Sequence, residues 1–243
     1  MKEFLDTALN TAETNGAEYT DIRISRHKNQ SIRTREDRIQ GISNSESYGF
    51  GVRVLVDGTW GFAASHRLTK NNVADITMRA LDIARANRVV QRIPIRLAEV
   101  ESYVDQWSSP IKKDPFQVPI NEKIDLLLNV NAEALKVKGA KYCSSSMLFM
   151  NEDKHFASTE GSVIQQNLHR VFPSFTVTAI DSERGEFETR AVDVLPMGLG
   201  YEYVEQSNLV EQAPKMAEEA VRKLTAKSVE PGPKDLILHP SHL

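Results

Sequence analysis

The six histidines are the residues of this chain best suited to hold a transition metal, but their spacing forms no metal-binding helix. A helical zinc site typically uses two histidines one turn apart, with a glutamate beside them to activate water. His239 and His242 come closest, yet Pro240 between them disfavours a helix. The other four are His27, His66, His155 and His169. The sequence therefore predicts no metal site and no catalytic residue within this chain.

The sequence also offers no suitable residues for a catalytic nucleophile or for a dinucleotide-binding site. Cys143 is the one cysteine, and no histidine or arginine adjoins it to lower its pKa, so we expect a buried structural thiol. The serines 144–146 lack the strand, turn and helix that present a catalytic serine. Gly49 and Gly51 precede no predicted helix, which excludes a dinucleotide-binding fingerprint.

The segment 48–65, YGFGVRVLVDGTWGFAAS, is the best candidate for a binding surface. Asp57-Gly58 between two β-rich runs predicts a tight hairpin, and the apolar arm 50–56 predicts a largely buried strand. Glycines inside strands indicate either a bulge or bend, or a strand edge shaped to pass an extended peptide, and both interpretations stay open. The candidate substrate-binding residues are Gly49, Gly51, Arg53, Trp60 and Gly61.

Arg53 is the lone charge in an otherwise apolar strand. An arginine that faces the core must be paired, because an unpaired buried charge is costly. We favour an internal ion pair over a contact with a substrate carboxylate. On that basis Arg53→Ala would destabilise the fold by roughly 2–4 kcal/mol.

The elements around this hairpin alternate between helices and strands. Apolar spacing predicts a helix over 2–15, and Thr69 is a suitable N-cap for a second helix reaching about Arg88. Between them we expect strands at 19–26, 31–34 and 39–43, with a polar turn at 35–38, before the hairpin at 49–65. This order indicates an α+β fold with an antiparallel sheet.

A proline-rich connection over 89–119 separates this half from a second one, with a boundary near Lys113. In the second half we predict a helix over 121–137, strands over 146–158, 163–180 and 186–194, and a helix from near Gln212 to about Lys227. The loop from Pro196 to Tyr203, rich in glycine and aromatic residues, is a second candidate contact surface. The role of its Met197–Tyr203 part is not decided by the sequence.

The two halves share a Gly-Ala-x-Tyr exit from their first helix. It occurs at 16–19 and again at 139–142. We therefore predict an α+β fold of two related helix-plus-antiparallel-sheet units, 1–112 and 113–228, in which Gly16 and Gly139 both have positive φ. Residues 229–243 are predicted to be a linker and the first strand of a further β-rich domain.

Composition narrows the classes of partner. The net charge is −3, from 30 basic and 33 acidic residues, so direct nucleic-acid binding is disfavoured. A basic cluster is answered by nearby acids and fits a solvated sheet face. One cysteine, no leader and no long apolar run indicate a cytoplasmic protein without a membrane partner. The cluster comprises Arg23, Arg26, His27, Lys28, Arg33, Arg35 and Arg38.

Taken together, these segments resemble the TldD/PmbA family, whose members were once named modulators of DNA gyrase. The resemblance rests on the Gly-Ala-x-Tyr exit, GFGVRVLVDGTWGFAAS, the helix from Thr69, and the Pro-Gly-Pro linker before LILHPSHL. It covers the whole chain but only the amino-terminal half of a family member. The closing LILHPSHL is similar to the TldD branch, in which a helix carrying His-Glu-x-x-x-His comes next.

The resemblance implies a cytoplasmic zinc-dependent metalloprotease that acts on small or unfolded peptides, including precursors of ribosomally made peptide antibiotics. It implies pairing with a PmbA/TldE-like subunit, or a homodimer, with zinc on the TldD-like subunit. No zinc ligand carries over, because the chain stops before the metal helix. We therefore expect a substrate-restricting part that is inactive alone. The alternative is a non-catalytic peptide- or partner-binding regulatory module.

Overall fold

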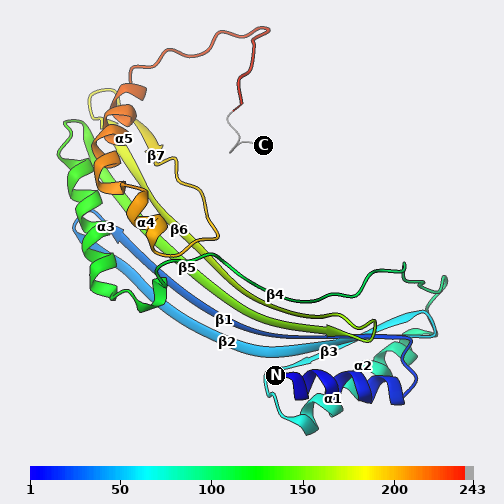
Figure 1. Cartoon of the computed structure of the whole chain (residues 1–243). Coiled ribbons are helices and arrows are strands. Elements are labelled where there is room, and N and C mark those ends of the chain that lie inside the picture. The colour runs from blue at the N-terminus through cyan, green and yellow to red at the C-terminus, as the bar shows by residue number, and fades with distance from the viewer. Residues whose placement is uncertain (239–243) are drawn as a thin grey trace. The chain divides into compact units, whose positions relative to one another are not determined.

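The computed structural model describes residues 1–238, and its central element is a seven-stranded sheet (Figure 1). The strand order is β3-β2-β1-β5-β6-β4, and β7 also pairs with β6. β4 runs parallel to β6, whereas β3 and β7 are antiparallel to their neighbours. The strands are β1 (Tyr19–Arg35), β2 (Arg38–Val56), β3 (Thr59–Ser65), β4 (Val104–Ser108), β5 (Ala140–Ser158), β6 (Val163–Asp181) and β7 (Glu186–Ala191). This arrangement is the α+β fold predicted from the sequence.

The chain forms two compact units that are discontinuous in sequence, because the four long strands contribute to both. Unit 1 comprises Met1–Lys28, Ser45–Ser109 and Asn151–Leu168. Unit 2 comprises Asn29–Asn44, Pro110–Met150 and the chain from His169 onward. The ranges 1–112 and 113–228 stay a prediction about domains, since these units describe packing.

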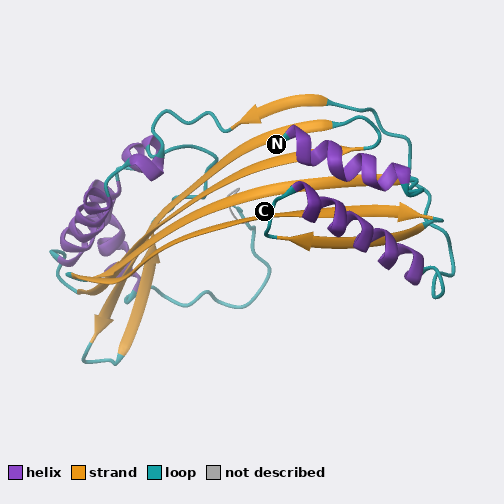
Figure 2. Ribbon diagram, turned by 90° about the horizontal axis from the view of Figure 1, so that it is seen from below, coloured by secondary structure: helices purple, strands orange, loops and turns teal. Residues whose placement is uncertain are grey.

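Unit 1 packs two helices, α1 (Lys2–Thr14) and α2 (Lys70–Asn87), on one face of its part of the sheet (Figure 2). Thr69 caps α2, as predicted, by accepting a hydrogen bond from the Asn72 backbone N–H at 3.3 Å. Alternate residues of the strands point into this interface and bury the apolar core. Its fully buried members include Ala8, Ala12, Ile22, Val52, Val54, Val73, Ala80, Leu81 and Ala84.

The predicted Asp57-Gly58 hairpin is confirmed. Both residues have positive φ, 48° and 70°, which is the backbone of a type I′ turn, and Val56 pairs with Thr59 across it. Gly61 in β3 is buried against α2. A Cβ atom there would lie 2.7 Å from the Ala84 backbone nitrogen and would also collide with the Ala80 carbonyl. Close approach of two backbones therefore requires this glycine.

Unit 2 has helices α3 (Ile120–Leu135), α4 (Glu202–Gln206) and α5 (Leu209–Lys223), and a short 3₁₀ helix, η1 (Pro115–Gln117). α3 and α5 pack side by side (Figure 1). One core cluster joins the end of α3 to α5 and includes Cys143, which is the buried thiol predicted from the sequence. Another lies around Leu127, Met147 and Phe149.

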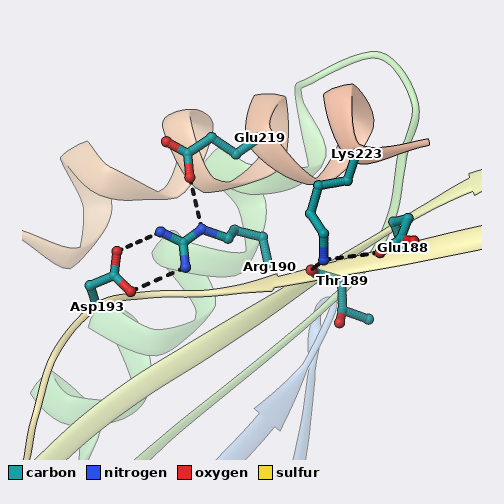
Figure 3. A network of polar contacts seen from close by, with 6 residues as sticks. All are labelled: Glu188, Thr189, Arg190, Asp193, Glu219 and Lys223. Carbon is teal, nitrogen blue, oxygen red and sulfur yellow. Dashed lines mark hydrogen bonds and ion pairs between the residues drawn. The ribbon is translucent and has the colours of Figure 1, made fainter. Parts of the chain in front are cut away.

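Ion pairs bind β7 to α5 within unit 2 (Figure 3). Arg190 Nε donates to Glu219 at 2.7 Å, and its Nη2 donates to Asp193 at 2.5 Å. Lys223 Nζ lies 2.9 Å from the Glu188 carboxylate and donates to the Thr189 carbonyl at 2.8 Å. The lysine thereby links α5 to both a side chain and the backbone of β7.

Both predicted glycine conformations are confirmed, since φ is 83° at Gly16 and 102° at Gly139. Gly16 and Ala17 donate to the carbonyls of Glu13 and Ala12, which is a Schellman ending for α1. Gly139 instead lies in a turn closed by Ala140 N–H and the Val137 carbonyl. Each half still runs helix, two long strands and a short strand, followed by α2 in the first half and by α4 and α5 in the second. Descent from one duplicated unit stays a prediction.

Several predicted boundaries are wrong. The strands expected at 31–34 and 39–43 are parts of β1 and β2, because pairing inside a wide sheet keeps polar stretches extended. The connection 89–119 contains β4 and η1, which are held by the edge of β6 and by Asp114. α5 starts at Leu209, after Asn208 in the left-handed conformation, so Pro214 lies inside the helix.

The strand predicted at the carboxyl-terminal end is not formed within the described residues. Residues 235–238 have no regular secondary structure and Ile237 is almost fully exposed. An unpaired strand has no partner for its backbone hydrogen-bonding groups. The remainder of that predicted strand, with His239 and His242, lies outside the described residues.

Candidate functional site

A groove of about 760 Å³ lies in unit 1. Because Val52 and Val54 face the helices, Gly51 and Arg53 face the opposite, open side of the sheet. Residues of the same orientation on β1 and β3 complete the surface. The groove is lined chiefly by Asp21, Arg23, Ser25 and His27 of β1, Gly49, Gly51 and Arg53 of β2, and Phe62 and Ala64 of β3, with His66 at the end. We call it the unit 1 groove.

Arg53 is held in the unit 1 groove by Asp21. Its Nε and Nη2 donate to the same carboxylate oxygen, at 2.8 and 2.5 Å. The guanidinium also lies over the Trp60 ring, 4.6 Å from the centroid. The Asp21 side chain is 9% exposed, whereas that of Arg53 is 50% exposed. The arginine is therefore anchored from below and open to the groove above.

Tyr19 extends this cluster beneath Arg53. Its ring meets Trp60 edge-on, with centroids 5.7 Å apart. Burial, followed by the negative charge of Asp21, raises the pKa of Tyr19 to about 12. Tyr19 therefore stays neutral at physiological pH, and its hydroxyl acts only as a hydrogen-bonding group near the ion pair.

A second arginine, Arg23, rests on an aromatic ring in a similar way. Its guanidinium carbon lies 5.9 Å from the centroid of Phe156, which is on β5. Arg23 is exposed, and it forms no ion pair with any residue of the described chain. The unit 1 groove thus holds one carboxylate and two guanidinium groups.

Two glycines of β2 allow close packing at the base of the unit 1 groove. A Cβ on Gly51 would lie 2.8 Å from a ring carbon of Phe62, and one on Gly49 would lie 3.1 Å from the Ser65 carbonyl oxygen. The Phe62 ring can therefore lie against the bare backbone of β2, although its side chain is 60% exposed. An exposed phenylalanine beside charged groups offers an apolar contact to a ligand.

The structure places three of the five predicted site residues, Gly49, Gly51 and Arg53, together in this groove. Trp60 lies beside Arg53, and Gly61 faces the other side against α2. The predicted ion pair of Arg53 is confirmed, but a core-facing position is wrong, because half of its side chain is exposed. A role in substrate binding stays a prediction for all five.

Sequence reasoning missed the other side of the groove. Arg23 and His27 belong to the basic cluster interpreted as a solvated face, and Asp21 is one of the acids that answer it. Phe62 and His66 were not selected. The alternation around Ile22 and Ile24 already assigns the odd-numbered residues of β1 to one face. The sequence did not show that these residues of β1 lie beside Arg53 of β2 on the same face of the sheet.

The second candidate surface, the loop before α4, is a structural clip within unit 2. The Glu202 carboxylate is buried and accepts backbone N–H bonds from Gly200, Lys112 and Lys113, at 2.9, 3.1 and 2.9 Å. Burial raises the pKa of Glu202, but these bonds to its charged form outweigh burial and lower the pKa. Such a carboxylate holds two loops together and is not free to act as a base.

Lys123 is another charged group that unit 2 encloses. It is fully buried, donates to the Pro115 carbonyl at 2.6 Å and to the Gln30 side chain, and lies 4.5 Å from the Phe149 ring centroid. Burial lowers the pKa of its ammonium group. With no exposed surface, it cannot reach a substrate, and its partners make it a structural cation.

Comparison with known proteins identifies the family. Residues 20–87 match the domain described as PmbA/TldA metallopeptidase domain 1, and residues 113–227 match the PmbA/TldA metallopeptidase central domain. The chain belongs to the PmbA/TldD family of metallopeptidase-like proteins.

Curated relatives agree with this assignment. A protein named metalloprotease from Methanothermobacter thermautotrophicus is 26% identical over 223 residues, which cover 92% of this chain and 47% of the relative. A zinc metalloprotease TldD homolog from Saccharolobus solfataricus is 31% identical over 81 residues, 33% of this chain and 18% of the relative. The chain spans about half the length of the relatives that it matches over most of its own length.

Solved structures share the fold. A protein named as a modulator of DNA gyrase from Thermotoga maritima has a TM-score of 0.71 at 17% identity, over 95% of this chain and 50% of that chain. The counterpart from Bacteroides thetaiotaomicron scores 0.70 at 18% identity, with coverages of 94% and 51%. TldE from Thermococcus kodakarensis scores 0.55 at 13% identity, with coverages of 91% and 47%.

The described residues do not fit the zinc ion that the family's names imply. No group of three or more His, Cys, Asp or Glu side chains gathers within residues 1–238. His155 and Asp153 form a pair at 3.6 Å, but two ligands do not make a zinc site. Cys143 is buried, and burial raises its thiol pKa to about 12, which disfavours the thiolate that binds metal. We therefore derive no catalytic step from this chain.

Proposed function

We propose that this chain is the substrate-restricting, non-catalytic part of a TldD-like zinc-dependent metallopeptidase that acts on small or unfolded peptides. Membership of the PmbA/TldD family and the names of the curated relatives support the class of enzyme. Because the chain spans about half of those relatives, the activity of the whole protein is part of the proposal.

The observation that carries the proposal is the unit 1 groove on the open face of the β2–β3 hairpin. Its volume of about 760 Å³ lies within the range of known ligand sites. Because Gly49 and Gly51 carry no side chains, Phe62 and the end of β3 lie close to β2, and the exposed Phe62 ring offers an apolar contact to an extended peptide. Arg53 supplies a fixed charge, Trp60 supports Arg53, and Gly61 lets α2 hold the hairpin from the opposite face.

We further propose that the zinc ligands lie beyond residue 243 and that the whole enzyme pairs with a PmbA/TldE-like subunit or with itself. The absence of a ligand cluster from residues 1–238 and the length of the relatives support the first point. The shared fold with TldE is compatible with the second. No helix of the described chain is long and apolar enough to cross a membrane. We propose a cytoplasmic location, since the lone cysteine is buried and unpaired by disulfide.

Peptide binding by the purified chain tests the role of the groove. Short fluorescein-labelled unstructured peptides are titrated with the wild-type chain and with Gly51→Val, and binding is followed by fluorescence polarisation. Gly51→Val should weaken binding at least about tenfold, because its side chain collides with the Phe62 ring and displaces that ring from its place in the groove. Gly41→Val is the matched control, since a Cβ at Gly41 meets nothing closer than 3.7 Å. Equal binding by all three proteins overturns the assignment of the groove.

Metal analysis tests the division of labour. After dialysis, the chain 1–243 should carry far less than one zinc per molecule and should leave peptide digests uncut. Extending it through a His-Glu-x-x-x-His segment should bring zinc and cleavage together. Stoichiometric zinc with chelator-sensitive cleavage by the short chain contradicts the proposal. If the natural protein lacks such a segment, a peptide-binding regulatory module replaces the peptidase.

A further inference from the structure

The unit 1 groove has an excess of positive charge that the fold does not neutralise. Its charged lining residues are Arg23, Arg53 and Asp21, in addition to two histidines. Asp21 is paired with Arg53 through one carboxylate oxygen, and Arg23 has no carboxylate partner in the described chain. A groove with two guanidinium groups and one buried carboxylate attracts anions.

Arg53 is held in place before any ligand arrives, and Arg23 lies near an aromatic ring. Arg53 is fixed by Asp21 on one edge and by Trp60 beneath it, and Arg23 rests on Phe156. A supported arginine loses less rotational freedom when it binds a ligand, and its planar group matches a carboxylate geometrically. Phe62 and the bare backbone at Gly51 lie in the same groove and suit the apolar part of a peptide.

We propose that the unit 1 groove selects extended peptides that carry carboxylates, with Arg23 and Arg53 as the recognising residues. The inference rests on the proposed function and adds the class of substrate. A peptide fits better than a nucleic acid, because the groove offers only two guanidinium groups, too few to neutralise a run of phosphates, beside an exposed phenylalanine. Charge complementarity therefore decides specificity, and the apolar floor accommodates the chain.

A pair of matched peptides tests this directly. Two labelled peptides have the same length and order of residues, with Asp and Glu in one replaced by Asn and Gln in the other. The wild-type chain should bind the acidic peptide at least about tenfold more tightly, which corresponds to about 1.4 kcal/mol. The preference should shrink as the salt concentration rises, because the contacts are partly exposed.

Arg23→Gln is the main variant, because Arg23 is exposed and has no ion-pair partner among residues 1–238, so its loss should leave the fold intact. It should lower the affinity for the acidic peptide about tenfold and leave the affinity for the amide peptide unchanged. Arg79→Gln is the control, since Arg79 is exposed on α2, on the other side of the sheet. Arg53→Lys keeps a positive charge but loses the planar group, and it should also reduce the preference.

The outcomes separate the two claims. Equal affinity for both peptides, unchanged in Arg23→Gln but weakened by Gly51→Val, overturns the selection for carboxylates and leaves the binding role standing. Binding of neither peptide overturns both. Tighter binding of a labelled single-stranded oligonucleotide than of the acidic peptide also overturns the inference, because the groove would then recognise phosphates.

Discussion

The two faces of the β2–β3 hairpin use the same kinds of residue for opposite purposes. On the covered face, Gly61 lets the backbone of α2 approach, and the surrounding valines are fully buried. On the open face, Gly51 lets the ring of Phe62 lie on the strand, and no helix covers either. The comparison teaches that a strand glycine gains its meaning from what lies above it. Gly61 accommodates a helix backbone, and Gly51 accommodates the side chain of Phe62.

Charged groups show the same contrast between units. Unit 2 encloses Glu202 and satisfies its carboxylate with backbone N–H groups. Unit 1 anchors Arg53 on one edge only and leaves half of the side chain exposed. A fully satisfied buried charge stabilises a structure, whereas a half-satisfied, pre-positioned one is available to a ligand. The following predictions compare these enclosed and open positions.

The largest expected effect is that of Gly61→Ala on the covered face. The added methyl group collides with the backbone of α2, which cannot move without opening the core, so the free energy of unfolding should fall by more than about 3 kcal/mol. Gly51→Ala on the open face is the control and should cost less than about 1 kcal/mol, because the ring of Phe62 can swing away. Urea unfolding measures both. A wild-type midpoint for Gly61→Ala contradicts the close approach of α2.

Glu202→Gln should come next. It keeps the shape of the side chain but loses charge-assisted bonds to three backbone N–H groups, so we expect a loss of about 1–3 kcal/mol at neutral pH. The folded state lowers the pKa of Glu202 below its ordinary value of 4.5, so its contribution is present above that value. It disappears as the pH falls through the folded pKa.

The wild-type and Glu202→Gln chains should therefore differ at neutral pH and converge in acid, as urea unfolding at several pH values would show. Glu205→Gln, at an exposed position in the same short helix, is the matched control. A difference that stays constant down to acid pH would mean that the charge of Glu202 is not what binds the two loops.

Arg53→Ala should have a smaller effect on stability than the sequence suggested. It leaves Asp21 without its cation, but the pair borders the open groove and water can replace the guanidinium, so we expect a loss of about 1–2 kcal/mol in place of 2–4. Thermal and urea unfolding measure the loss. A cost above 3 kcal/mol would show that Arg53 acts as an enclosed structural charge, and the contrast with Glu202 would fail.

The smallest expected change in stability is that of Phe62→Ser. Its side chain is 60% exposed, so the free energy of unfolding should change by less than about 0.5 kcal/mol. Peptide binding by the unit 1 groove should nevertheless weaken several-fold, because the apolar contact is gone. Phe149→Ser, at a fully buried position in unit 2, should do the reverse and destabilise strongly. Unchanged peptide binding by Phe62→Ser would remove the open face from the site.

The sequence by itself determined the local elements and the kind of fold. The Asp-Gly hairpin, the Thr69 cap and the positive φ at Gly16 and Gly139 follow from backbone rules that act over a few residues. The sequence did not show that segments 31–34 and 39–43 belong to the long strands β1 and β2. Their polar residues become extended only when neighbouring strands satisfy their backbone hydrogen bonds. The same holds for β4, which exists through its pairing with β6.

Only the tertiary structure decided what the chemical groups do. Arg53 required a carboxylate on either interpretation. That this carboxylate is Asp21, 32 residues earlier, follows from the position of β1 beside β2 in the sheet. The same pairing sets Arg23 over Phe156 and gathers the groove. The alternation of side chains along a strand assigns each residue to one face of the sheet, and it can be recognised from a few neighbouring residues. Which residues then meet on that face depends on strand order, a long-range property that local spacing does not carry.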